Sequence, residues 1–145
     1  MKNLKTFVLR YKIQILSLIG ILISIYLIYS HYSDTSLACP ESSVINCANV
    51  VTSQYSTFFT LPLPVYGIVY FIFSFVLAFI PKLKKLLFGV SIIALIVVFR
   101  LVYIEIALIG SICIYCTSLH IIIFFIFSIL LYDLLVNNKS VSNNS

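Results

Sequence analysis

Charged residues are scarce in this sequence, and their scarcity decides the class of the protein. Only 9% of the 145 residues are charged, 62% are hydrophobic, and tryptophan is absent. A soluble domain of this size cannot bury so much apolar surface, because small domains leave a large fraction of their surface in contact with water. The composition therefore excludes a soluble globular domain and indicates an integral membrane protein.

Several common sequence signatures are absent as well. The chain has no CxxCH motif for haem, no glycine-rich dinucleotide loop, no evident metal cluster and no internal repeat. No segment alternates polar and apolar residues with a period of two. Since only helices and closed barrels satisfy backbone groups in lipid, the pattern predicts helices.

Four apolar runs are long enough to span about 30 Å of hydrocarbon as helices. We predict an all-α fold, an integral membrane four-helix bundle over residues 1–136, with a disordered cytoplasmic tail over residues 137–145. A long extracytoplasmic loop with a short half-helix joins the first two spans. The predicted spans are residues 13–29, 62–80, 86–109 and 113–136.

Lysine and arginine are distributed unevenly between the connections. Apart from Arg100, the basic residues precede the first span, fill the second connection or follow the fourth span: Lys2, Lys5, Arg10, Lys12, Lys82, Lys84, Lys85 and Lys139. The first connection, residues 30–61, contains neither lysine nor arginine. This asymmetry predicts that both termini are cytoplasmic and that the long first loop is extracytoplasmic.

The four cysteines form two close pairs on the predicted outer side. Cys39 and Cys47 lie in the first loop, and Cys113 and Cys116 lie at the outer start of the fourth span. Disulfides form and persist outside the cytoplasm. The alternatives are inert packing and a structural zinc site, for which the spacing of Cys39 and Cys47 is wide. A permanent structural disulfide also fits Cys39 and Cys47 taken alone.

Cys113 and Cys116 form a CxxC motif at a predicted helix N-terminus. Residues three apart share a helix face, and a helix N-terminus lowers the pKa of a thiol and activates it for exchange. Two such pairs on one surface indicate a relay by thiol–disulfide exchange. We expect Asn46 to cap a half-helix that lies over the bundle mouth and brings Cys47 near Cys113. Its apolar face would comprise Cys47, Val50 and Val51.

The electron acceptor must be reached from the fourth helix. Cys116 is expected about one turn below the membrane surface, facing the interior of the bundle. A lipid-soluble quinone is the acceptor most available at this place.

The order and spacing of these residues resemble those of the vitamin K epoxide reductase family. The likeness is closest to prokaryotic disulfide-forming members, here without a fused thioredoxin-like domain. The residues that carry it are Cys39-x7-Cys47, Ser53, Pro62, Pro64, Gly67 and Cys113-Ile-Tyr-Cys116-Thr117. The resemblance implies a quinone-coupled thiol oxidoreductase that reoxidises a thioredoxin-like carrier and supports disulfide bond formation. The implied acceptor is a quinone of the menaquinone or ubiquinone type, and no metal is expected.

The resemblance also implies a role for each cysteine. Cys39 would exchange with a separate extracytoplasmic thioredoxin-like (DsbA-type) protein, Cys47 would transfer to Cys113, and Cys116 would react with quinone. The implied location is a prokaryotic cell membrane, with the active site on the extracytoplasmic side.

Two further residues are expected near the quinone. Ser53 would lie beside the active site. His120 occupies the position of a tyrosine that animal members carry one helical turn beyond the CxxC motif. It could donate a hydrogen bond to a quinone oxygen or move a proton, and the alternative is a neutral packing histidine. Animal members also hold a quinone carbonyl with an asparagine, whereas this chain has none between Thr60 and Gly67.

Two rival interpretations depend on the order of the cysteine pairs and on the two charged residues of the third span. The DsbB family has its CxxC motif in the first outer loop and its wider pair in the second, the reverse of this order. A non-catalytic membrane subunit or small channel with a disulfide-stapled loop is the alternative from another class. Arg100 and Glu105 would then line a pathway; otherwise they could support the site, orient the quinone or extend outward.

Overall fold

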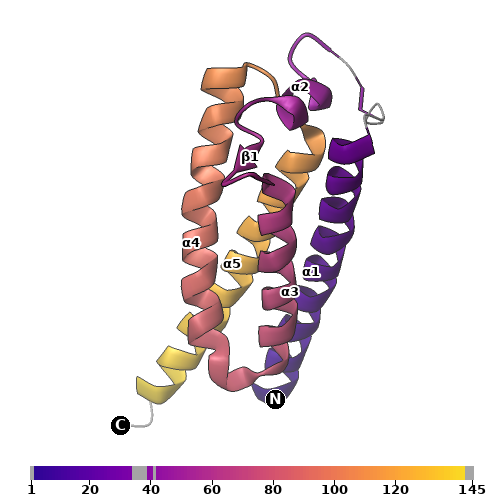
Figure 1. Cartoon of the computed structure of the whole chain (residues 1–145). Helices are drawn as coiled ribbons and strands as arrows, with labels where there is room; N and C mark the ends of the chain where they lie inside the picture. Colours follow the sequence, from indigo (N-terminus) through magenta and orange to yellow (C-terminus); the bar gives the residue numbers. More distant parts are fainter. Residues whose placement is uncertain (1, 34–38, 41, 143–145) are drawn as a thin grey trace.

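The computed structural model of the chain describes residues 2–33, 39–40 and 42–142. Its long helices run side by side as a bundle (Figure 1). They are α1 (Lys2–Ser33), α3 (Leu63–Phe79), α4 (Lys84–Tyr103) and α5 (Ile114–Ser142). The predicted all-α membrane class is confirmed, because three helical stretches are long and apolar enough to cross a membrane: Phe7–Ser33, Pro81–Ile109 and Ile114–Val136. The apolar helix α3 is shorter, with 17 residues.

Helix bounds differ from the predicted spans mainly at polar ends. α1 begins at Lys2 and not near residue 13, and α5 continues to Ser142, over most of the segment predicted as a tail. Residues 143–145 of that predicted tail lie outside the described residues. An apolar run marks only the part of a helix that suits lipid. The polar start of α1 contains the good helix formers Lys2, Leu4 and Lys5, which extend the helix beyond the apolar run.

Prolines set the limits of α3. Pro64 lies in its first turn, where the missing backbone N–H costs no hydrogen bond. Pro81 follows the end of α3 and opens the short 3₁₀ helix η1 (Pro81–Leu83), which leads directly into α4. This tight connection keeps α3 and α4 antiparallel neighbours.

Small residues let α1 and α3 approach closely. A Cβ atom added to Gly20 would lie 2.6 Å from the ring of Phe71, which is fully buried. Ser17, Ser24 and Ser74 are also completely buried. Small side chains at helix contacts are typical of membrane bundles, where close packing of backbones replaces the hydrophobic effect.

The segment between α1 and α3 covers one end of the bundle, which we call the loop end (Figure 1). It contains the short helix α2 (Cys47–Thr52) and an antiparallel hairpin of β1 (Thr57–Phe58) and β2 (Leu61–Pro62). The start of α1 and the end of α5 lie at the opposite end. The loop end therefore carries the predicted site.

Candidate active site

The structure brings the four cysteines together at the loop end. Cys39 and Cys47 are joined by a disulfide, whereas Cys113 and Cys116 are free. A zinc site of four thiolates is therefore not formed in this state. In redox terms, the outer pair is oxidised and the inner pair, Cys113 and Cys116, is reduced.

Helix α2 lies where the sequence predicts the half-helix. The side chain of its N-cap, Asn46, accepts a hydrogen bond from the backbone N–H of Asn49 at 3.0 Å. The face predicted to be apolar is buried, and it comprises Cys47, Val50 and Val51. His31 at the end of α1 donates a hydrogen bond from Nδ1 to the carbonyl oxygen of Val51 at 3.1 Å. These contacts hold α2 against the bundle.

A backbone bridge aligns the two cysteine segments. Ile45 pairs with Ile112 in a parallel β-bridge. The N–H of Ile112 donates to the carbonyl of Val44 at 2.9 Å, and the N–H of Asn46 donates to the carbonyl of Ile112 at 3.3 Å. Cys47 directly follows Asn46, and Cys113 directly follows Ile112. The bridge therefore sets the two cysteine segments side by side. No sequence pattern predicts this bridge, since single bridges between distant loops leave no periodic signal.

The CxxC motif opens α5. The backbone N–H of Cys116 donates to Sγ of Cys113 at 3.4 Å, and the N–H of Thr117 bonds to the carbonyl of Cys113 at 2.9 Å. Cys113 is fully buried and lies just before the span that begins at Ile114. The side-chain hydrogen bond from Cys116 lowers the pKa of the Cys113 thiol to about 7, against the opposing effect of burial. Cys113 is thus a good leaving group in thiol–disulfide exchange.

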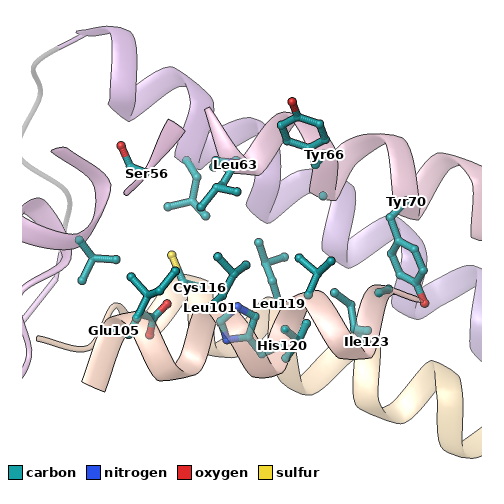
Figure 2. A pocket seen from close by; sticks show the side chains of 18 of the residues that line it. Ser56, Leu63, Tyr66, Tyr70, Leu101, Glu105, Cys116, Leu119, His120 and Ile123 are labelled. Atoms are coloured by element: carbon teal, nitrogen blue, oxygen red, sulfur yellow. The ribbon is translucent and has the colours of Figure 1, made fainter. Parts of the chain in front are cut away.

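A cavity of about 410 Å³ lies beneath α2, between α3, α4 and α5. Its lining is almost entirely apolar. Of the four cysteines, Cys116 is the one that lines it. Figure 2 shows Cys116 together with Glu105 and His120 on one wall, across from Leu63 and Tyr66.

The two predicted ligand residues both line this cavity but differ in their bonding. The hydroxyl of Ser53 donates to the carbonyl of Val50 at 2.9 Å, so it closes the end of α2. Nδ1 of His120 is buried and has no hydrogen-bond partner in the described chain. His120 therefore lines the cavity and also contains a buried polar atom without a partner.

The structure separates the two charges of the third span. Arg100 is exposed on the outer side of α4, whereas Glu105 is 7% exposed and lines the cavity. The reason is helical geometry, since five residues correspond to about 140° around the axis. Glu105 lies in a π-helical turn, η2 (Ile104–Ile109), that continues α4. No sequence pattern predicts this turn, although π-helical turns are frequent at functional sites.

The cavity reaches the outer surface of the bundle between α3 and α4. Among its lining residues that are also exposed are Val69 and Phe73 of α3 and Ile93 and Val97 of α4. In a membrane this face contacts lipid. An apolar molecule dissolved in the bilayer can thus reach the cavity sideways.

Two adjacent cysteine pairs in a membrane bundle can exchange disulfides with each other, and this chemistry defines a membrane thiol oxidoreductase. Comparison with protein families makes the assignment specific. Residues 12–131 match the model of the Vitamin K epoxide reductase family. The match covers most of the chain, so the chain belongs to that family. Among curated proteins, no sequence matches it.

Proposed function

We propose that the protein is a quinone-coupled thiol oxidase that reoxidises a separate thioredoxin-like (DsbA-type) protein and so supports disulfide bond formation. One observation carries the proposal. Cys116 lines an apolar cavity that is open toward lipid, while its partner Cys113 adjoins the segment of the loop disulfide. The inner pair thus connects an aqueous thiol donor with an acceptor dissolved in the membrane.

The cavity fits a quinone in size and chemistry. Its volume falls within the roughly 300–1,000 Å³ of small-molecule sites, and such sites are mostly apolar with few polar groups. His120 lines the cavity, so its imidazole ring would supply a hydrogen bond to a quinone oxygen. When bound, a quinone supplies a two-electron oxidant that takes up two electrons and two protons.

The relay needs only disulfide exchange until its last step. A thiolate of the carrier attacks Cys39, and the second carrier thiol releases Cys39 and leaves the carrier oxidised. Cys47 then attacks Cys113 of the inner disulfide, which frees Cys116. Cys39 attacks Cys47 and releases Cys113, whose lowered pKa favours its departure as a thiolate. Each exchange breaks one S–S bond and forms another, so no outside oxidant is needed up to this point.

The product of these exchanges is an oxidised loop pair and a reduced inner pair. This is the redox state of the four cysteines in the structure. The remaining step oxidises the inner dithiol, which releases two protons and passes its two electrons to the acceptor through the cavity. The net reaction converts a carrier dithiol and a quinone into a carrier disulfide and a quinol.

We further propose that the loop end faces the extracytoplasmic side of a prokaryotic cell membrane, with both termini in the cytoplasm. The support is the distribution of basic residues. The connection between α3 and α4, opposite the loop end, carries Lys82, Lys84 and Lys85, whereas residues 30–61 contain no lysine or arginine. An excess of positive charge marks cytoplasmic connections.

The test is anaerobic mixing of purified protein, a reduced thioredoxin-like donor and a soluble quinone, followed by quinone absorbance. The native protein should form one quinol for each donor disulfide. Cys116→Ser should form none, yet it should still exchange with the donor through Cys39. The matched variant Cys39→Ser should fail with the protein donor but reduce quinone when dithiothreitol supplies the thiols.

Quinol formation by Cys116→Ser at the native rate would refute the proposal. Absence of quinol from the native protein with several donors and quinones would do so as well. A non-catalytic subunit or channel would keep its function in both variants.

A further inference from the structure

Glu105 is a buried acidic residue that the relay leaves unused. Its side chain lies on the cavity wall beside Cys116 and His120 (Figure 2). Glu105 and the two inner thiols are close enough for their charges to interact. A carboxyl group inside a membrane span is costly and usually serves a function.

The π-helical turn fixes the position of Glu105. Gly110, at a φ of 66°, ends this turn, and its N–H bonds to the carbonyl oxygen of Glu105. The N–H of Ser111 bonds to the same oxygen at 3.2 Å. The backbone of Glu105 therefore anchors the segment that leads to the CxxC motif, and its carboxyl position is tied to that of the thiols.

No cation neutralises Glu105 within the described residues. Arg100, the nearest basic residue in the sequence, is exposed on the outer face of α4. The salt bridge of the described chain joins Lys84 to Asp133 at the opposite end of the bundle. A structural ion pair is thus not the reason for the burial of Glu105.

Oxidation of the inner pair requires two protons to leave. Cys113 adjoins the aqueous loop segment and deprotonates readily. Cys116 faces an apolar cavity, where a proton has few acceptors. Besides Glu105, the cavity is lined by titratable groups from α1, the loop, α3 and α5: His31, Tyr55, Tyr66, Tyr70, Cys116 and His120.

We propose that Glu105 is the proton-transfer group of the inner dithiol. A carboxylate oxygen of Glu105 accepts the proton of Cys116 Sγ as the S–S bond forms, and the carboxylic acid then gives this proton up on the cavity side. Two S–H bonds are lost and one S–S bond is formed. The Cys113 proton passes to water at the loop end. The quinone acceptor of the proposed function, on which this inference rests, takes up the two electrons, the proton from Glu105 and a second proton from water.

The first measurement is a single-turnover assay with the inner pair reduced in advance. Glu105→Gln keeps the size of the side chain but removes its titratable carboxyl group, and it should slow quinol formation roughly 100-fold, in the range of general acid–base effects. Glu105→Asp should recover part of the rate. Arg100→Gln removes a charge from the outer face of the same helical stretch and should leave the rate unchanged.

The second measurement needs neither quinone nor turnover. Without an acceptor in the cavity, the proton taken from Cys116 stays on Glu105. Infrared difference spectra between the dithiol-reduced and chemically oxidised protein should therefore contain a carboxylic C=O band that shifts in D₂O. The chain has only four acidic residues, and Glu105 is the one that lines the cavity, so the band is assignable. Glu105→Gln should lack this band. If that variant does not fold, the native spectrum and Glu105→Asp still decide.

Two results would overturn the inference while leaving the proposed function intact. One is a native rate of quinol formation in folded Glu105→Gln. The other is a native difference spectrum without a carboxyl band. Failure of the native protein to form quinol would instead refute the proposed function, even if the carboxyl band were present.

Discussion

The two ends of the bundle each bury one carboxyl group, but the two groups have different partners. Asp133, 8% exposed, forms an ion pair with Lys84 and joins α5 to α4 at the end opposite the loop. Glu105, 7% exposed, has no such cation in the described chain and lies beside free thiols. The two carboxyl groups are thus almost equally buried, but in the described chain only Asp133 forms an ion pair. A paired charge stabilises the bundle, whereas an unpaired charge is available for chemistry.

The largest expected effect is at the loop end, where the backbone bridge holds the two cysteine segments side by side. Ile112→Pro removes the N–H that bonds Val44 and should shift the two cysteine segments apart. Because small misplacements of reacting groups cost about 100-fold, transfer from the loop pair to the inner pair should slow by this factor. Stopped-flow reduction of the inner disulfide by the donor measures the transfer.

The control is Ile112→Ala, which keeps both backbone hydrogen bonds and should transfer at close to the native rate. Quinone reduction started from a pre-reduced inner pair should be unaffected in both variants. Equal transfer rates in Ile112→Pro and native protein would show that the bridge does not align the cysteines.

The loop end should also respond to pH near neutrality. The pKa of Cys113 is lowered to about 7, so its thiolate predominates above that pH and falls about tenfold per unit below it. Alkylation of Cys113 in the reduced protein, read by mass spectrometry, should show a midpoint near this value. Cys116→Ala removes the hydrogen bond that causes the shift and should move the midpoint upward. A native midpoint at or above the ordinary value of about 8.5 contradicts the prediction.

The opposite end should affect stability and not the reaction. Asp133→Asn breaks a partly buried ion pair and should lower the free energy of unfolding by about 2 kcal/mol, between surface and fully buried pairs. Denaturation in detergent micelles measures this loss. The variant should retain quinol formation within about twofold.

A double-variant cycle with Lys84→Gln isolates the energy of the pair. If Asp133→Asn slowed quinol formation as strongly as Glu105→Gln, the contrast between the two ends would be lost.

Local patterns predicted much of the site. Asn46 before an apolar i, i+3 pattern is sufficient to specify α2, because capping and amphipathicity act within a few residues. The positions of the cysteine pairs followed from the order of apolar runs and loops. The helix period also separates Arg100 from Glu105 around the axis, although it does not tell which of them faces inward.

Features that depend on distant partners could not be predicted. The bridge between Ile45 and Ile112 joins two loops whose own sequences contain no strand pattern. The π-helical turn depends on N–H groups of Gly110 and Ser111 that bond back to Glu105. Hydrophobic periodicity indicates which face of a helix is apolar, but it does not indicate where a π-helical turn adds one residue.

The sideways opening between α3 and α4 has a consequence for inhibitor binding under the proposed function. The carrier would approach Cys39 from water, whereas the lipid-soluble substrate would enter and leave through Val69, Phe73, Ile93 and Val97. Occupancy of one entrance leaves the other accessible. Competitive inhibitors of the two substrates should therefore bind simultaneously, and each should leave the dissociation constant of the other unchanged.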